Sequence, residues 1–207
     1  MVPIMATRAA LRAFQPDPPR AESFPEQGDW TYEDYCRLPT GGWRYEVVRG
    51  DLRVAPAPNW KHQQNSLNLA VLFREYLREE PLGKVCQAPI DVILPGDLAS
   101  PVQPDLIFIV RERLGIIKDR YVRGAPDLVV EILSPSNWLD DRTTKFELYA
   151  EAGVREYWIA DNRLRTVEVF VLRGGAWELL GRFGPGERVR SEVLPGFSPT
   201  VDEIFAD

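Results

Sequence analysis

The sequence predicts an α/β protein of the α+β kind, in which a mixed β-sheet is flanked by helices and preceded by an extra N-terminal β-hairpin. The run Leu128–Leu133 is apolar at all but one position and lies between prolines, which is typical of a strand buried on both faces. The segment Trp60–Glu79 has apolar residues at helical spacing and stops before Pro81. Tyr45–Val48 and Leu52–Val54 flank a glycine-containing turn, which predicts the hairpin.

Capping residues predict two shorter helices. Thr31 can cap a helix that ends near Pro39, because its hydroxyl accepts hydrogen bonds from free backbone N–H groups. Asp140 or Asp141 can cap another that runs to about Ala152, where a glycine follows. The remaining predicted elements are the strands Val85–Leu94, Val102–Val110, Val154–Ala160, Thr166–Leu172, Ala176–Arg182 and Arg188–Leu194, and a helical turn at Thr200–Phe205.

Length and composition predict one folded domain after a flexible arm. Residues 1–28 contain five prolines and no sustained apolar period, so we interpret them as a flexible N-terminal arm. Residues 29–207 contain no internal repeat and no linker that would divide them, so we expect a single domain. Apolar residues make up 44% of the chain, which is enough for a sizeable core at this length.

The sequence disfavours membrane and zinc-binding classes of protein. No apolar stretch approaches the roughly 20 residues of a membrane-spanning helix, so no membrane partner is expected. Cys36 and Cys86 are isolated and match no metal-ligand spacing, which favours a reducing compartment, the cytoplasm, and no zinc site. The only histidine, His62, excludes a mechanism or metal site that needs two.

Two predicted interior strands each carry one carboxylate. Glu131 interrupts the apolar run Leu128–Leu133, and Asp105 lies at the start of a second apolar run. An ionised carboxylate inside such a strand is costly unless a cation or hydrogen bonds receive it. Two acids on two interior strands are therefore the donors that a divalent metal site needs.

The charge of the chain leaves nucleic-acid binding open. A net charge of −6 counts against a broadly basic binding surface, but a local basic face can coexist with a negative total. Five basic residues cluster between the two acidic strands, and they fit a solvated loop as well as a substrate-facing patch. They are Arg111, Arg113, Lys118, Arg120 and Arg123.

Several motifs follow one another in a fixed order between about residues 30 and 206. They are Tyr45–Gly50, His62, Gln103–Asp105, Gly124–Ser136, Asp141 with Lys145 and Tyr149, Gly153–Val154, Glu156–Trp158 and Leu194–Phe197. Together they resemble the Uma-type (Uma two) family of bacterial proteins, a branch of the PD-(D/E)XK, or restriction-endonuclease-like, superfamily. The resemblance implies a restriction-endonuclease-like fold and a site for a divalent metal, Mg²⁺ or Mn²⁺.

The resemblance assigns a catalytic set to three residues. Asp105 and Glu131 match the two acids of the superfamily pattern and would bind the metal ion. The superfamily lysine is missing, because Leu133 stands two residues after Glu131. Lys145, near the start of the next helix, is the best substitute, and it would position the attacking water. A surface lysine paired with Asp141 is the alternative.

Four further residues are candidates for supporting roles. Glu46 resembles a helper acid and a third metal ligand, although a solvent-facing strand acid fits equally well. His62 could contact phosphate or act as a base, but a histidine at a helix start is more often structural. Asp127 lies about 13 Å along the strand from Glu131, too far to share one ion, so it is interpreted as a strand-entry or supporting residue. Ser134 could donate a hydrogen bond near the site, or simply belong to a turn.

The sequence thus predicts a divalent-metal-dependent endonuclease that hydrolyses DNA phosphodiester bonds, in a cytoplasmic homodimer. A non-catalytic nucleic-acid-binding or protein-interaction module that retains the nuclease fold is the alternative, favoured by the negative charge and the displaced lysine. A metal-dependent enzyme acting on a small phosphorylated substrate is a third reading, which a deep closed pocket would favour.

Overall fold

The computed structural model describes residues 24–39, 43–97, 100–134 and 142–207. Most of the predicted N-terminal arm, and the predicted caps Asp140 and Asp141, therefore lie outside the described residues. The helices are α2 (Tyr32–Cys36), α3 (Trp60–Glu79), α5 (Thr144–Ala152) and α6 (Val201–Ile204), with 3₁₀ turns η1 (Pro95–Asp97) and η2 (Arg111–Ile116). The strands are β1 (Trp43–Val48), β2 (Asp51–Pro56), β3 (Gly83–Gln87), β4 (Asp91–Ile93), β5 (Leu106–Val110), β6 (Tyr121–Arg123), β7 (Leu128–Leu133), β8 (Glu156–Asp161), β9 (Thr166–Arg173) and β10 (Ala176–Phe183).

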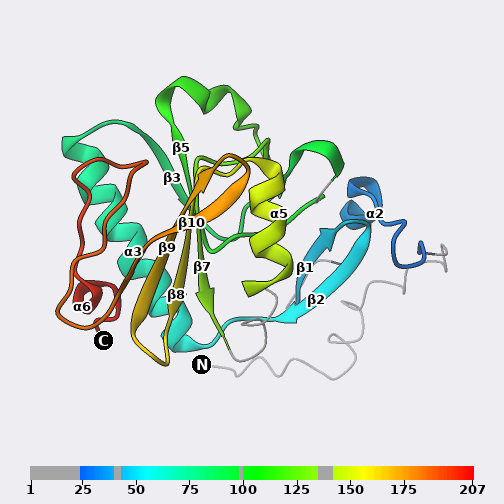
Figure 1. The fold of residues 1–207 in the computed structure, drawn as a ribbon. Helices are drawn as coiled ribbons and strands as arrows, with labels where there is room; N and C mark the ends of the chain where they lie inside the picture. Colours follow the sequence, from blue (N-terminus) through cyan, green and yellow to red (C-terminus); the bar gives the residue numbers. More distant parts are fainter. Residues whose placement is uncertain (1–23, 40–42, 98–99, 135–141) are drawn as a thin grey trace, which may run out of the picture.

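A six-stranded sheet in the order β10-β9-β8-β7-β5-β3 forms the centre of the fold (Figure 1). Within this sheet of described strands, β7 and β8 are the only parallel neighbours, and α5 provides the crossover between them. The other neighbours are antiparallel, so the sheet is mixed. The predicted fold class, a mixed sheet flanked by helices with an extra hairpin, is confirmed.

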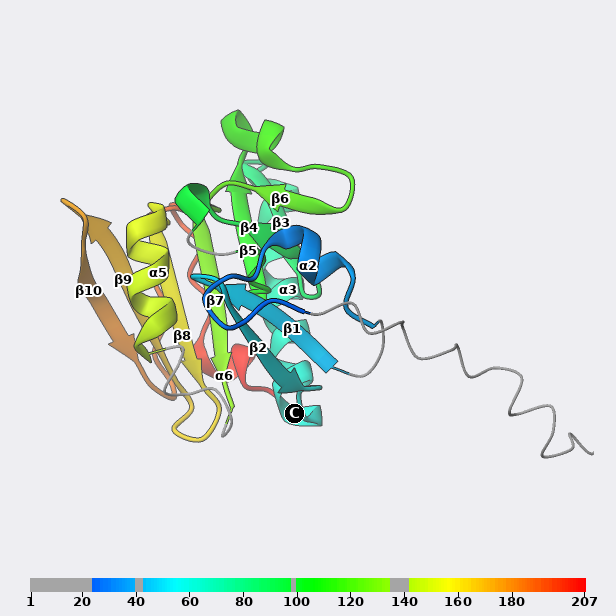
Figure 2. The ribbon, with the colours of Figure 1, turned by 90° about the vertical axis from the view of Figure 1, so that its right-hand side faces the viewer.

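Helices cover both faces of this sheet (Figures 1 and 2). One face packs against α3 and the C-terminal segment with α6, around Phe73 and Trp158. The other packs against α5 and the hairpin strand β1, around Val48, Leu148 and Tyr157. Side chains alternate between the two faces along each strand. Residues 127, 129, 131 and 133 of the β7 segment therefore point toward α5, and this places Glu131 on that face.

The hairpin β1–β2 brings polar residues onto the α5 face. Its register pairs Trp43 with Pro56 and Val48 with Asp51, and the turn has positive φ at Arg49 and Gly50. Position 50 requires glycine, since a Cβ there would meet the backbone of Gly28. Because Val48 packs against the sheet, alternation turns residues 44 and 46 the same way.

The long helix α3 is capped by the Asn59 side chain, which accepts a hydrogen bond from the His62 backbone N–H. The helix buries Leu69 and Phe73 and leaves Trp60 exposed. Among the helices of the described ranges, none is both long and apolar enough to cross a membrane.

Three predicted strands differ from the observed ones. Val85–Leu94 is split into β3 and β4, which lie in different sheets with Pro89 between them. Val102–Val110 is a strand only from Leu106 onward, because Pro104 interrupts the ladder. Arg188–Leu194 is not a strand, since only Arg188 forms an isolated bridge, with Thr200.

Candidate active site

Asp105 lies immediately before β5 and is 2% exposed. Its Oδ1 accepts a hydrogen bond from the Arg44 guanidinium at 3.2 Å. Its Oδ2 lies 3.1 Å from His62 Nε2 and accepts the Ile132 backbone N–H at 2.8 Å. Burial alone would raise the pKa of Asp105, but His62, Arg44 and the Ile132 N–H together hold it below its ordinary value. Asp105 is therefore stabilised as a carboxylate.

Glu131, in the middle of β7, is fully buried on the α5 face. Its Oε1 receives Lys145 Nζ at 2.9 Å and the Tyr149 hydroxyl at 2.7 Å. Its Oε2 is buried and accepts no hydrogen bond from the described residues. Burial raises the pKa of Glu131, and the Asp105 charge acts in the same direction while Lys145 opposes it. The site thus contains a carboxylate oxygen that no protein group of the described chain satisfies.

Lys145 reaches the site from the first turn of α5 and is 3% exposed. Its ammonium lies between two acids, 2.9 Å from Glu131 and 3.3 Å from Glu46. Glu46 also accepts the Gln103 backbone N–H at 2.7 Å, which joins the hairpin to the segment before Asp105. An ammonium buried between two carboxylates is not the surface lysine of the alternative interpretation.

Arg44 is a site residue that the sequence analysis missed. Its guanidinium is bonded to Asp105 and lies 3.8 Å from Glu46. Burial would lower the pKa of Arg44, but Glu46, Asp105 and Glu131 raise it well above its ordinary value. The missed signal is its spacing, because Arg44 precedes Glu46 by two positions and alternation puts both on one face. Similar spacing indicates Tyr149, because it lies one helical turn after Lys145 and therefore on the same face of α5.

Three acids and two cations therefore meet at this site. Asp105, Glu131 and Glu46 face Arg44 and Lys145, and the ion pairs are at most 3.8 Å long. Among the described residues, no three His, Cys, Asp or Glu side chains are arranged to hold a metal ion. A metal ion at this place would have at most two carboxylate ligands from the described residues and would complete its shell with other ligands such as water.

Asp127 contacts other residues than those of this cluster. Asp127 is fully buried and pairs with Arg113 at 2.7 Å and Arg155 at 3.4 Å. It also accepts the Val110 backbone N–H at 3.0 Å, so its contacts tie β7 to β5 and η2. Arg113, one of the clustered basic residues, is engaged there and not with the acids of the site. Ser134 follows β7 directly and is partly exposed.

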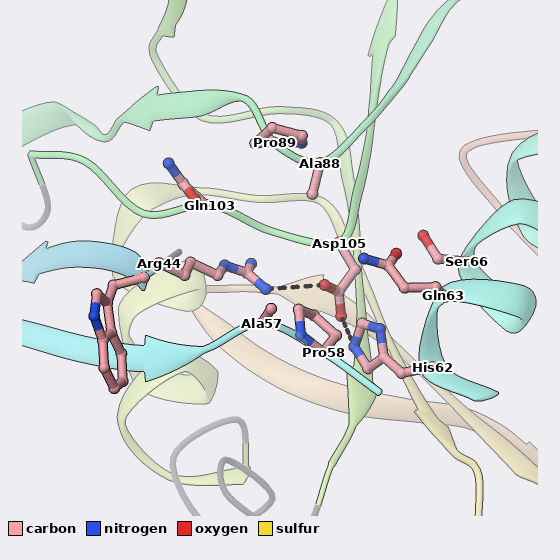
Figure 3. Close-up of a pocket in the computed structure, with 11 residues that line it drawn as sticks. Arg44, Ala57, Pro58, His62, Gln63, Ser66, Ala88, Pro89, Gln103 and Asp105 are labelled. Atoms are coloured by element: carbon pink, nitrogen blue, oxygen red, sulfur yellow. Dashed lines mark hydrogen bonds and ion pairs between the residues drawn. The ribbon is translucent and has the colours of Figure 1, made fainter. Parts of the chain in front are cut away.

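A pocket of about 320 Å³ lies beside Asp105 (Figure 3). In the figure, Arg44 approaches Asp105 from the hairpin and His62 approaches it from α3. Proline and alanine side chains give the pocket apolar walls, and three further polar side chains line it. The lining residues are Trp43, Arg44, Ala57, Pro58, His62, Gln63, Ser66, Ala88, Pro89, Gln103 and Asp105.

Most of the chain matches the model of a known family. Residues 32–202 match the model of the Uma2 family, whose description is "Putative restriction endonuclease". The chain therefore belongs to the Uma2 family, and the family predicted from the motifs is confirmed. Among proteins with curated descriptions, none matches this chain.

A solved structure supports the fold. The chain is similar to a protein from Anabaena variabilis ATCC 29413, described as a putative nuclease belonging to DUF820. The two are 18% identical with a TM-score of 0.69, and the alignment covers 86% of this chain and 98% of the other. At this level of identity the likeness shows a shared nuclease-like fold.

Proposed function

We propose that the protein is a divalent-metal-dependent endonuclease that hydrolyses phosphodiester bonds of DNA. The observation that carries the proposal is Glu131, a fully buried carboxylate with one unsatisfied oxygen beside Lys145. A buried polar atom without a partner is costly, and a bound cation would supply a partner for this oxygen. Membership of the Uma2 family supports the nuclease hypothesis.

The donor set suits Mg²⁺ or Mn²⁺. Glu131 Oε2 accepts no hydrogen bond from the described ranges, and the Oδ1 contact of Asp105 with Arg44 is long, at 3.2 Å. Magnesium takes oxygen ligands and often uses only one or two carboxylates, with water in the remaining positions. Asp105 and Glu131 would hold the ion, which would stabilise negative charge on the scissile phosphate. Glu46 is the third ligand that the resemblance suggests, but its contacts with Lys145 and Gln103 favour a role in holding the lysine.

The protein groups have separable roles in this proposal. Lys145 holds a water beside Glu131 and offsets negative charge that develops during phosphoryl transfer. Glu46 fixes the Lys145 ammonium from the opposite side. His62 holds Asp105 in one orientation through its Nε2 contact. We also propose that residues 29–207 form one domain and that the protein is a cytoplasmic homodimer.

Metal binding and cleavage test the proposal together. Calorimetry with Mn²⁺ should detect a site in the wild type that Glu131→Ala loses. Glu178→Ala, which changes an exposed acid on β10, is the matched control and should bind like the wild type. Cleavage of DNA should require Mg²⁺ or Mn²⁺ and disappear with Glu131→Ala. Equal manganese affinity in the wild type and Glu131→Ala would remove Glu131 from the site.

A non-catalytic interaction module is the second candidate. The observation that favours it is the cation content of the site, because Arg44 and Lys145 already neutralise two of the three acids. The net charge of −6 agrees with it. Absence of cleavage of DNA and RNA with either metal, in a protein shown to be folded, would favour this candidate over the nuclease.

A further inference from the structure

The pocket beside Asp105 has the chemistry of a nucleobase site. Ala57 and Pro58 on one segment, and Ala88 and Pro89 on another, contribute apolar walls. Trp43 adds an indole that is 59% exposed. A base presents flat apolar faces and polar edges, so it needs apolar walls and a few polar groups at the rim.

Polar groups are available at the pocket for the edges of a base. Gln63 and Gln103 both line it, and the Gln103 amide nitrogen is fixed by hydrogen bonds to Tyr35 and Asp91. His62 also lines it, is 2% exposed, and has a buried Nδ1 that makes no hydrogen bond in the described part of the chain. A fixed amide and an unpartnered ring nitrogen are groups that a ligand with donors and acceptors would satisfy.

Two exposed tryptophans lie at the same end of the hairpin. Trp43 is the cross-strand partner of Pro56, and Trp60 follows Pro56 by only four positions. Trp60 is 83% exposed, although it is the first residue of the helix that carries His62. An exposed indole that lines a pocket, as Trp43 does, is typical of a stacking platform for unpaired bases.

The charge of the protein favours stacking over backbone contacts. Duplex DNA is held mainly through basic contacts to phosphates, and this chain has a net charge of −6. Stacking on an aromatic side chain does not depend on the charge of the protein and is available only to a base that is out of the duplex.

We propose that this pocket receives an unpaired base of single-stranded DNA, with Trp43 stacked on the base, next to the site at Asp105 and Glu131. The inference rests on the proposed nuclease function and narrows its substrate to an unpaired strand or an unpaired region of a duplex. Gln63, Gln103 and His62 contact the edges of the base, and the adjoining phosphate lies toward Asp105.

Binding in metal-free buffer tests the proposal without cleavage. Fluorescence anisotropy of labelled oligonucleotides should show that the full chain binds single-stranded DNA at least about 10-fold more tightly than the duplex of the same sequence. Trp43→Ala should weaken single-strand binding by about 10-fold, and Trp43→Phe should retain most of it. Leu179→Ala removes a similarly exposed apolar side chain from the edge strand β10 and should bind like the wild type.

Three results would overturn the pocket assignment: wild-type affinity in Trp43→Ala, equal binding of duplex and single strand, or equal binding of a free mononucleotide and the oligonucleotide. Tighter binding of the matching RNA strand would overturn DNA as the ligand. Cleavage with Mn²⁺ is measured in parallel. If the protein cleaves DNA but binding does not depend on Trp43, the base site is wrong and the nuclease function stands. If binding depends on Trp43 but no cleavage occurs, the base site stands and the nuclease function is wrong.

Discussion

Two fully buried glutamates on the neighbouring parallel strands β7 and β8 have opposite surroundings. Glu156 lies on the α3 face and accepts four hydrogen bonds, all from uncharged donors. They come from the Trp158 indole, the Ser191 hydroxyl and the backbone N–H groups of Glu192 and Val193, at 2.7–3.0 Å. Glu131 lies on the α5 face, where one of its oxygens has no hydrogen bond from the described residues.

The difference separates a structural acid from a candidate functional one. Both oxygens of Glu156 accept hydrogen bonds, so the side chain holds the loop around residues 191–194 in place. Neither oxygen is left to bind a ligand. Glu131 receives Lys145 and Tyr149, its donors among the described residues, on one oxygen. Burial of an acid therefore does not by itself indicate function, and the unsatisfied oxygen is the feature that does.

The largest expected effect on stability comes from Glu156→Gln. One amide nitrogen would then face the N–H groups of Glu192 and Val193, leaving buried donors without an acceptor. We expect the free energy of unfolding to fall by about 2–5 kcal/mol. Urea denaturation measures this free energy.

The matching change at the other glutamate should have little effect on stability. In metal-free buffer near pH 7, the free energy of unfolding of Glu131→Gln should stay within about 1 kcal/mol of the wild-type value, because a glutamine oxygen can still receive Lys145 and Tyr149. A loss of several kcal/mol in Glu131→Gln would make Glu131 a structural acid as well.

Removal of the lysine tests the functional half of the comparison. Lys145→Ala should reduce DNA cleavage by about 10²-fold or more, which is the usual scale for a positioned group of this kind. Manganese affinity should stay nearly unchanged or increase, because a positive charge beside Glu131 is removed. Single-turnover cleavage and calorimetry measure the two effects. Full cleavage activity in folded Lys145→Ala would contradict the assigned role.

The pH dependence of stability should distinguish Glu131 from Asp105 in metal-free buffer. The pKa of Glu131 is raised by burial above its ordinary value of 4.5, so its contribution to folding is complete below that pH and is lost as the pH rises through the raised pKa. The pKa of Asp105 is lowered from 3.8, so its contribution is present above that pH and is lost as the pH falls through the lowered value.

Non-titrating variants measure these two contributions. Glu131→Gln should gain stability relative to the wild type as the pH rises above about 4.5. Asp105→Asn should show its greatest deficit above about pH 3.8 and a smaller one at lower pH. Denaturation curves at several pH values provide the test. Parallel pH profiles for both variants and the wild type would mean that neither pKa shift is present.

The smallest effect is expected at Asp127, another buried acid. Arg155 is 57% exposed, and Asp127 keeps Arg113 and the Val110 N–H without it. Arg155→Ala should therefore change the free energy of unfolding by about 0.5 kcal/mol or less. Its cleavage activity should equal that of the wild type. A large loss of activity would bring Asp127 back into the functional site.

The sequence alone determined the fold class, the family and the burial of Asp105 and Glu131. The run around Glu131 is so apolar that only an interior strand fits it, and an acid there has few explanations. Boundaries were less accurate where one residue decided them, because Pro89 and Pro104 interrupt runs that are otherwise typical of strands. The apolar run and the prolines each involve only a few neighbouring positions, so they can be recognised in a single sequence.

Only the tertiary structure decided which side chains meet. Arg44 and Glu46 share one face by alternation, but nothing local indicates that the hairpin packs beside β5 and α5 and delivers them to Asp105 and Lys145. The surroundings of Glu156 likewise depend on the loop around residues 191–194, whose donors lie 35 to 37 positions after it. Contacts between distant segments are set by packing of the whole chain, and the partners of a buried charge are such contacts.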